Sequence, residues 1–240
     1  MKVFLVTGAA KRIGAAIAKM LHGEGFNLIL HYRSSRQEAE LLQQHLNRIR
    51  PDSVHLLQAE LRRLSEIHAC VDNALSFWGR LDGLINNASA FYPTPLGEVS
   101  EDHWDELLDC NLKAPFFLSQ AVYPHLQQTQ GCIVNLVDIY ARSPRLDYPV
   151  YSIAKAGLAA MTHALAKEMA PAVRVNGVAP GAILWPDRPL TEEEKTAMLN
   201  TIPLKRLGKE EDIAKAVRYL ICDGDYVTGQ ILVVDGGRSL

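Results

Sequence analysis

The sequence predicts a single-domain α/β fold built on a doubly wound, parallel sheet of seven strands. Short apolar runs rich in β-branched residues alternate with longer segments of helical periodicity along the 240 residues, and this alternation is typical of β-α-β units. No Pro/Ser-rich linker and no internal repeat divides the chain. With 48% hydrophobic and 22% charged residues, the chain can bury one large core. We therefore expect one domain over residues 1–240.

The expected elements follow from these apolar runs and from the turn residues between them. Strands are predicted over residues 3–6, 27–32, 53–58, 83–86, 132–137, 174–178 and 231–234. Helices are predicted over residues 13–23, 36–50, 65–78, 101–127, 151–170 and 210–222. The inward face of the second helix is predicted from residues at three- and four-residue intervals, namely Glu38, Leu41, Leu42, His45 and Ile49. Residues 181–203 carry Pro186, Pro189 and Pro203, and we expect an irregular segment there that acts as a substrate lid.

The composition argues against several functional classes. A net charge of −2 lacks the basic excess of a chain that binds nucleic acid. The four cysteines lie far apart and form no C-x-x-C pair, which argues against a disulfide framework and a metal site. No charged leader precedes the first strand, and no apolar run reaches the roughly 18 residues that span a bilayer. We therefore expect a soluble, cytoplasmic protein without metal, nucleic-acid or membrane partners.

A turn of small residues, Thr7-Gly8-Ala9-Ala10-Lys11-Arg12-Ile13-Gly14, follows the first expected strand. Small side chains let backbone N–H groups approach a pyrophosphate, and the helix that follows presents its N-terminus to an anion. Any α/β protein can use such a turn without a ligand. Its place after the first strand favours a dinucleotide site, because ligands of doubly wound sheets lie at the carboxyl ends of the strands.

The second expected strand ends at Tyr32-Arg33-Ser34, and no carboxylate lies between Leu28 and Gln37. An acid at this point binds the ribose hydroxyls of NAD, whereas arginine attracts the 2′-phosphate of NADP. Residues 1–36 hold six Lys and Arg against one Glu, in a chain whose net charge is −2. We therefore expect NADPH as the cofactor, with Lys11, Arg12 and Arg33 near its phosphates.

Tyr151 and Lys155 lie four residues apart in an expected helix, so their side chains project from one face. A surface pair is the ordinary explanation of this spacing. Here, however, polar residues also gather at neighbouring strand ends: Asn86-Asn87-Ala88-Ser89 follows the fourth strand, and Asp138 stands thirteen residues before the tyrosine. Asn111 lies within the long helix between them. The pattern favours a catalytic role for this pair.

In order and spacing these motifs resemble the short-chain dehydrogenase/reductase family over essentially the whole chain. The matching segments are 7–14, 86–88, Asn111, Tyr151-x-x-x-Lys155, Pro180-Gly181 and Val234-Asp235-Gly236-Gly237. The resemblance implies a Rossmann-type fold in which Tyr151 is the general acid and Asn111 helps to carry a proton-relay water. It also implies that Lys155 binds the nicotinamide ribose and lowers the tyrosine pKa, which a phenol of ordinary pKa about 10 needs near neutrality.

The resemblance also implies a cofactor site, residue by residue. It comprises Gly8, Lys11, Arg12, Ile13, Gly14, Tyr32, Arg33, Ser34, Glu60, Leu61, Asn87, Ala88, Ser89, Tyr151, Lys155, Pro180 and Gly181. Glu60 stands where the family usually places an aspartate that meets the adenine amino group, and its longer side chain can accept the same hydrogen bond.

Two positions depart from the general family pattern. Arg12 replaces the usual third small residue of the first loop, and Asp138 replaces the usual catalytic serine. An ionised carboxylate only accepts hydrogen bonds, so it suits a simple ketone badly and suits a ring with amino and N–H donors better.

These departures, together with residues 87–96, resemble the pteridine reductase branch of the family. The resemblance implies that Phe91 stacks on the pterin, where stacking contributes about 1 kcal/mol beyond buried area, although Phe91 could instead be a buried loop anchor. It implies that Arg12 and Ser89 contact both cofactor and substrate, and that Asp138 and Tyr151 handle protons. By position, Leu184 or Trp185 closes over the substrate, unless Trp185 packs in a subunit interface. A homotetramer through helices 101–127 and 151–170 is implied.

The function expected is therefore NADPH-dependent reduction of a pterin ring, with dihydrobiopterin, dihydromonapterin or a dihydrofolate-like compound as substrate. Two alternatives remain. One is a reductase of ketones or 3-oxoacyl thioesters with an unusual aspartate. The other is a non-catalytic NADPH-binding sensor, which is disfavoured because a binder needs none of Tyr151, Lys155 and Asn111.

Overall fold

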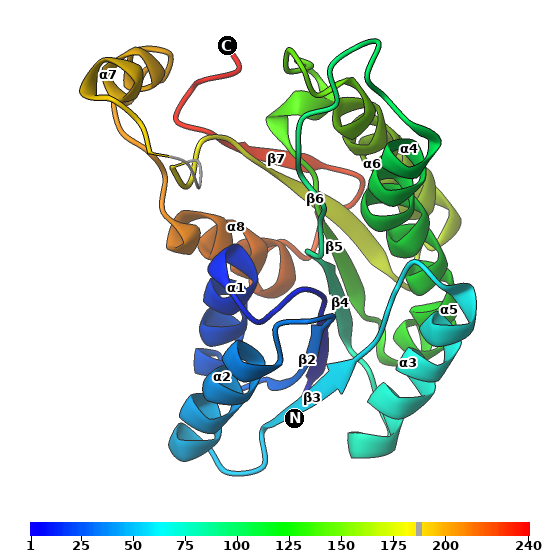
Figure 1. The fold of residues 1–240 in the computed structure, drawn as a ribbon. Helices are drawn as coiled ribbons and strands as arrows, with labels where there is room; N and C mark the ends of the chain where they lie inside the picture. The colour runs from blue at the N-terminus through cyan, green and yellow to red at the C-terminus, as the bar shows by residue number, and fades with distance from the viewer. Residues whose placement is uncertain (186–188) are drawn as a thin grey trace.

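A seven-stranded, all-parallel sheet forms the centre of the protein (Figure 1). This computed structural model describes residues 1–185 and 189–240. The strands lie in the order β3-β2-β1-β4-β5-β6-β7, so the winding reverses between β1 and β4. All seven predicted strands are confirmed to within two residues at their ends: β1 Val3–Val6, β2 Asn27–Tyr32, β3 Val54–Gln58, β4 Gly83–Asn86, β5 Cys132–Leu136, β6 Arg174–Pro180 and β7 Ile231–Val234.

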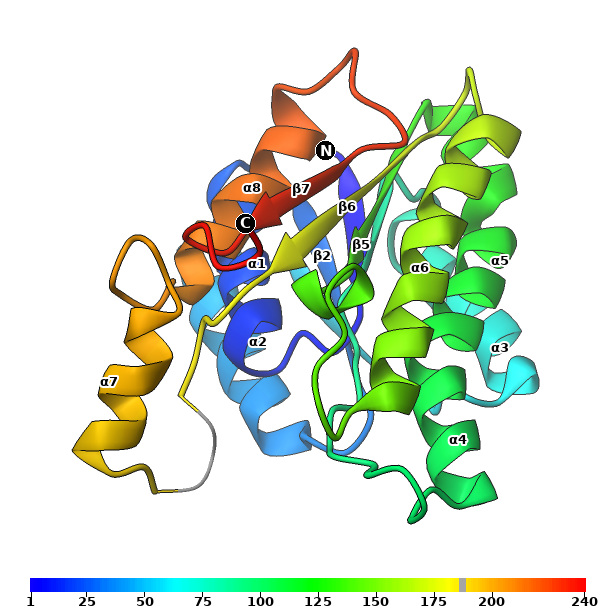
Figure 2. The same ribbon diagram turned by 90° about the horizontal axis from the view of Figure 1, so that it is seen from above.

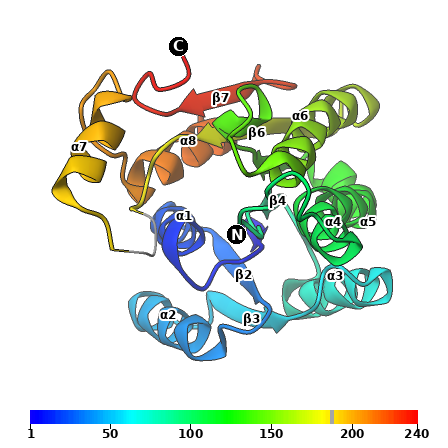
Figure 3. The ribbon, with the colours of Figure 1, turned by 45° about the horizontal axis from the view of Figure 1, so that its top comes forward.

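Helices cover both faces of the sheet (Figure 2), and buried side chains form a large core on each face. One face carries α1 (Arg12–Gly23), α2 (Arg36–Ile49) and α8 (Glu210–Cys222). The other carries α3 (Leu64–Trp78), α4 (Glu101–Leu108), α5 (Ala114–Thr129) and α6 (Pro149–Glu168). Successive residues of β1 alternate between the cores: Val3 and Leu5 join the second group of helices, Phe4 and Val6 the first. Figure 3 shows α1 packed beside α8. No described helix has the length and apolar composition to cross a membrane.

The segment predicted as one helix over residues 101–127 is divided by a π-helical turn. α4 ends at Leu108, residues Asp109–Lys113 form the π-helical turn, and α5 begins at Ala114. Asn111 lies inside this turn and is fully buried. Single π-helical turns are frequent at functional sites, and this one carries a residue that the sequence marks as catalytic.

The inward face predicted for the second helix is confirmed at Leu42 but is wrong as a whole. Its buried residues are Ala39, Leu42 and Leu46, whereas Leu41 and Ile49 are 58% and 66% exposed. The residues that are buried are also spaced at intervals of three and four. The first of them, the small Ala39, packs against Tyr32 at the end of β2.

The segment predicted as irregular over residues 181–203 contains a helix, α7 (Glu192–Asn200). A capping box begins it: the hydroxyl of Thr191 accepts from the Glu194 N–H, and the Glu194 carboxylate accepts from the Thr191 N–H. The helix buries none of its residues and stands away from the sheet (Figure 1). Pro186, one of the three prolines on which the irregular prediction relied, lies outside the described residues.

Candidate functional site

The small-residue turn after β1 is fastened to the end of β4. The Thr7 hydroxyl accepts from the backbone N–H groups of Asn87 and Ala88, both at 2.9 Å. The Asn87 amide donates back to the carbonyls of Thr7 at 2.8 Å and Gly8 at 3.0 Å. A Cβ atom on Gly14 would lie 2.3 Å from the Gly8 carbonyl oxygen, so only glycine permits this closure. Gly8, Gly14, Asn87 and Ala88 thus meet at the carboxyl ends of β1 and β4, as predicted.

The two basic residues of this turn differ in conformation and in contacts. Arg12 has φ +53°, a left-handed backbone that favours glycine, which explains why a small residue is usual there. Lys11 forms an ion pair with Glu38 of α2 at 2.5 Å. Glu38 follows directly after the segment from Leu28 to Gln37, which holds no carboxylate. The charge of Lys11 is therefore paired with a carboxylate beside the turn. Ile13 is partly buried and packs against the core of the α1 face.

His31 of β2 links the turn to β3 and is a residue that the sequence reasoning missed. Its Nδ1 accepts from the Gly8 N–H at 3.2 Å, and its Nε2 donates to the Ala59 carbonyl at 3.1 Å. Burial lowers the pKa of His31 to about 4, so the ring is neutral near pH 7 and this tautomer is fixed by its two partners. A histidine in an otherwise apolar strand was the available signal.

Arginine and glutamate side chains meet at the ends of β2 and β3. Arg62 donates to the Glu60 carboxylate at 2.8 Å, and this hydrogen bond is the main cause of the lowered pKa of Glu60. Arg33 lies 3.9 Å from carboxylate oxygens of both Glu60 and Glu106. The expected adenine partner Glu60 is therefore already engaged by arginine. Of the other residues predicted here, Tyr32 and Leu61 are buried and Ser34 is exposed.

Tyr151 and Asp138 form the centre of the candidate catalytic site. The phenol of Tyr151, on α6, donates to Asp138 Oδ2 at 2.8 Å, and the Tyr140 N–H donates to Oδ1 at 2.9 Å. Burial raises the pKa of the Asp138 carboxyl. Burial, and then the adjacent Asp138 carboxylate, raise the pKa of Tyr151 well above its ordinary value. The hydrogen bond couples the two groups, so protonation of one changes the pKa of the other.

Lys155 lies one helical turn beyond Tyr151 and is 2% exposed. Its ammonium donates to the Leu136 carbonyl at 2.8 Å and lies 5.7 Å from the centroid of the Tyr151 ring. Burial lowers the pKa of Lys155 to about 8. The Tyr151 pKa is raised and not lowered as expected, and the main causes of the rise are burial and the neighbouring Asp138 carboxylate.

Asn111 positions the loop that follows β4. Its amide nitrogen donates to the carbonyls of Ala90 and Leu107, both at 2.9 Å, and its Oδ1 accepts from the Ser89 hydroxyl at 2.6 Å. All hydrogen-bonding atoms of the Asn111 side chain are thereby engaged. The π-helical turn thus holds Ser89 and Ala90 in place beside the catalytic pair.

Phe91 lies against an aromatic cluster at the edge of this site. Its ring stacks on Tyr148 at a centroid distance of 4.7 Å and meets the edge of Tyr151 at 4.7 Å. The side chain is 48% exposed, so it is not the buried loop anchor considered as an alternative. The exposed part of the ring leaves an apolar surface next to the Tyr151–Asp138 pair.

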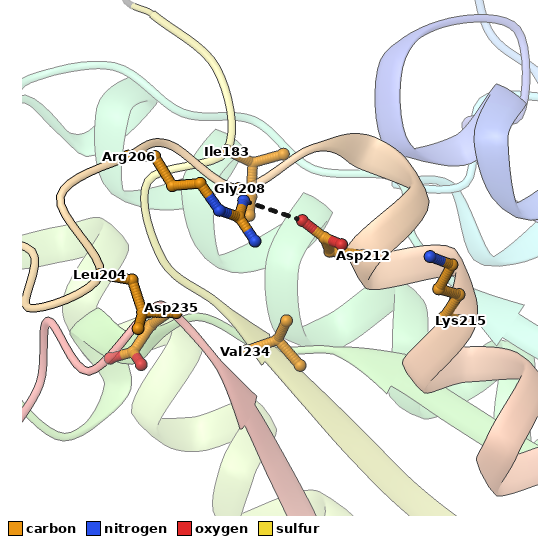
Figure 4. Close-up of a pocket in the computed structure, with 9 residues that line it drawn as sticks. Ile183, Leu204, Arg206, Gly208, Asp212, Lys215, Val234 and Asp235 are labelled. Carbon is orange, nitrogen blue, oxygen red and sulfur yellow. Dashed lines mark hydrogen bonds and ion pairs between the residues drawn. The ribbon is translucent and has the colours of Figure 1, made fainter.

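The segment after β6 crosses the end of β7. The Gly181 N–H donates to the Val234 carbonyl at 3.0 Å, and a Cβ atom on Gly181 would lie 2.5 Å from that of Asp235, so Pro180-Gly181 and the C-terminal motif lie in direct contact. Beside them lies a cavity of about 270 Å³ lined in part by Ile183, Arg206 and Asp212 (Figure 4). The catalytic pair does not line this cavity. Leu184 packs on the core, and Trp185 is 37% exposed.

Buried amides join the strands beneath the site, and sequence reasoning did not assign them a role. Asn86 donates to Asn135 at 2.9 Å, and Asn135 donates to Thr162 at 2.9 Å. These bonds connect β4, β5 and α6, the elements that carry Ser89, Asp138 and Tyr151. Asparagines at the ends of apolar strands were the signal for this network.

Comparison with known proteins places this site in a family. The family profile described as enoyl-(acyl carrier protein) reductase matches residues 8–239. Pteridine reductase 1 of Leishmania tarentolae is 36% identical over 99% of this chain and 96% of its own length. The 3-oxoacyl-acyl-carrier-protein reductase of Staphylococcus aureus is also 36% identical, over 100% of this chain and 98% of its own. A blue fluorescent protein from a metagenomic library, solved in complex with NADPH, superposes with a TM-score of 0.92 at 32% identity, over 100% of this chain and 98% of its own. The chain is therefore an oxidoreductase of the short-chain dehydrogenase/reductase family.

Proposed function

We propose that this protein is an NADPH-dependent reductase of a pterin ring. The observation that carries the proposal is the hydrogen bond from Tyr151 to Asp138 at 2.8 Å, beside the half-exposed ring of Phe91. A serine at the Asp138 position could donate a hydrogen bond to a substrate carbonyl, whereas an ionised carboxylate only accepts. The amino and N–H groups of a pterin supply the donors that such a site requires.

The residues around the first turn fit NADPH. The turn closes so tightly that Gly14 admits no side chain, and α1 begins within it at Arg12, so a pyrophosphate bound at this turn would lie at the N-terminus of a helix. Arg33 and Arg12 add positive charge at the ends of β2 and β1, which favours a 2′-phosphate over a free hydroxyl. The similarity to a structure solved with NADPH supports the same assignment. When bound, NADPH supplies the hydride.

The proton comes from the chain's own residues. Reduction of a ring C=N bond adds hydride to carbon and a proton to nitrogen, and Tyr151 with Asp138 holds a proton at this point. Transfer from the phenol leaves an anion that Lys155, 5.7 Å from the ring, can stabilise. Asn111 keeps Ser89 beside the pair. We assign Arg12 and Ser89 to contacts with both cofactor and substrate, and Leu184 or Trp185 to the lid over residues 181–203.

Reduction of a ketone or a 3-oxoacyl thioester is the second candidate. The S. aureus 3-oxoacyl reductase is as similar to this chain as the pteridine reductase is. The two candidates differ in what they require of Asp138. A pterin reductase needs the carboxylate, whereas a ketone reductase would gain from a hydroxyl donor there.

The deciding experiment follows NADPH absorbance with dihydrobiopterin, dihydromonapterin, dihydrofolate and an acetoacetyl thioester. We expect turnover with at least one dihydropterin and much less with the thioester. Asp138→Asn should reduce dihydropterin turnover strongly with a smaller change in binding, and Asp138→Ser should uncover weak ketone reduction. If Asp138→Asn reduces dihydropterins at the parental rate from pH 5 to 8, the assignment of a pterin substrate loses its main chemical support. Tight NADPH binding without any turnover would point to a sensor.

We also propose a homotetramer assembled through α4, α5 and α6. Large apolar side chains are partly exposed on these helices, among them Trp104, Phe116 and Ile153 at 43%, 37% and 49%. Light scattering of the purified protein should give four times the monomer mass, and Phe116→Glu with Ile153→Glu should reduce it. A monomer at micromolar concentration would contradict the assignment.

A further inference from the structure

We infer that Arg145 selects substrates that carry a negatively charged substituent on the pterin ring. Arg145 lies in the loop between Asp138 and α6, on the same side of the site as Phe91. The inference rests on the proposed pterin reduction and adds the chemistry of the group attached to the ring.

The guanidinium of Arg145 is placed by aromatic rings. Its central carbon lies 4.5 Å from the ring centroid of Tyr148, 5.6 Å from that of Tyr140 and 5.8 Å from that of Phe91. Phe91 is also the ring assigned to the substrate, and it stacks on Tyr148 at 4.7 Å. A substrate that lies on Phe91 therefore has Arg145 within reach of its substituents.

Among the residues that the structure describes, none forms an ion pair with this cation. Within residues 1–185 and 189–240, Arg145 forms no ion pair and its side chain makes no hydrogen bond. Rings that contact the face of a guanidinium leave the N–H groups at its edge available. Those groups match a carboxylate or phosphate in a two-point hydrogen bond. Burial raises the pKa of the Asp138 carboxyl more than the positive charge of Arg145 lowers it, but Asp138 and Arg145 form no ion pair, and the Asp138 oxygens accept from Tyr151 and from the Tyr140 N–H.

The backbone of the loop is held in the conformation that presents Arg145. Asp147 has φ +64°, a left-handed conformation that is uncommon outside glycine. Its carbonyl accepts from the Thr94 N–H at 2.7 Å, which ties the loop to the segment that carries Phe91. The Arg145 N–H lies 3.4 Å from the Ser152 hydroxyl, and the Arg145 carbonyl accepts from the Tyr148 N–H at 3.2 Å.

The test compares two substrates with the same ring and different charge. Dihydrofolate carries carboxylates on its substituent, and dihydrobiopterin carries none. For Arg145→Leu we expect KM for dihydrofolate to rise about tenfold relative to KM for dihydrobiopterin, with kcat for dihydrobiopterin little changed; tenfold corresponds to about 1.4 kcal/mol. Arg145→Lys should keep part of the preference. Arg142→Leu is the matched control, because Arg142 is also exposed on this loop but is not in the aromatic cluster of Phe91, Tyr140 and Tyr148.

Added salt distinguishes attraction of charge from packing. In the parent enzyme, KM for dihydrofolate should rise with salt more steeply than KM for dihydrobiopterin, and Arg145→Leu should remove the difference. The inference would be overturned if Arg145→Leu left the ratio of the two KM values unchanged. If both KM values rose by the same factor, Arg145 would only support the aromatic cluster. Binding of the same two pterins to the complex with NADP⁺ gives a separate readout. A parent enzyme that binds both pterins and reduces neither would contradict the proposed function, while the binding ratio would still decide the role of Arg145.

Discussion

Replacement of Lys155 by methionine should change how stability depends on pH. Lys155 is 2% exposed, and burial lowers its pKa from an ordinary 10.5 to about 8. Because one pKa unit corresponds to 1.36 kcal/mol, the buried charge costs the fold about 3 kcal/mol at pH 7. Methionine keeps the length of the side chain without the charge, so Lys155→Met should unfold at a higher urea concentration at pH 7.

The pH range of the effect follows from the two pKa values. Below about pH 8 the ammonium is charged in both the folded and the unfolded chain, and its full cost is present. Between about pH 8 and 10.5 the unfolded chain holds a proton that the folded chain has released, so the stability of the parent protein rises with pH. Lys155→Met lacks this rise, and its advantage should shrink steadily across that interval.

Urea unfolding of both proteins at intervals from pH 7 to 10 measures the effect. Loss of the hydrogen bond to Leu136 shifts the variant by a similar amount at each pH, so the difference in slope is the informative quantity. Lys167→Met is the matched control, since Lys167 lies on the exposed face of the same helix. Parallel curves for the parent and Lys155→Met would show that the lysine is not held as a costly buried charge.

Three further predictions test the site. Tyr151→Phe removes the transferable proton and keeps the ring, so turnover should fall by a factor on the order of 10² with NADPH affinity nearly unchanged in a fluorescence titration; parental turnover would place the proton donor elsewhere. Arg33→Asp puts an anion beside the 2′-phosphate and should weaken binding of NADPH much more than of NADH, whereas equal losses would exclude Arg33 as the discriminating residue. His31→Leu leaves the Gly8 N–H without its acceptor and should lower the free energy of unfolding by about 1–3 kcal/mol in urea; an unchanged midpoint would show that this link adds no stability.

The strands were predictable because parallel strands, buried on both faces, form continuous apolar runs that a sequence displays directly. The start of α7 has an equally local signal, since Thr191 and Glu194 form a capping box within four residues, but the prediction of an irregular segment relied on the prolines of residues 181–203. The links made by His31 were not predictable, because they join residues 23 and 28 positions away. Whether a polar side chain in a strand points to a turn, a neighbouring strand or solvent depends on the three-dimensional arrangement.

The direction of the pKa shifts was beyond the sequence for a similar reason. A tyrosine four residues before a lysine predicts that the two side chains meet on one helical face. It does not predict that the lysine ammonium donates to the Leu136 carbonyl while Asp138 accepts from the phenol. Burial and the choice of hydrogen-bond partner decide whether the pKa of each group rises or falls, and both are properties of the folded chain.

The π-helical turn at Asp109–Lys113 takes up one residue more than an α-helical turn would hold. Each residue of a regular α-helix advances the helix by about 100°, but here the extra residue is absorbed by the wider turn. Deletion of one residue would therefore give an unbroken α-helix in which Leu118 and Val122, both fully buried, still face the core. The same deletion would close the wide turn from which the Asn111 side chain reaches Ser89 and Ala90. Shortening this stretch by one residue should thus affect the candidate site more than the stability of the fold.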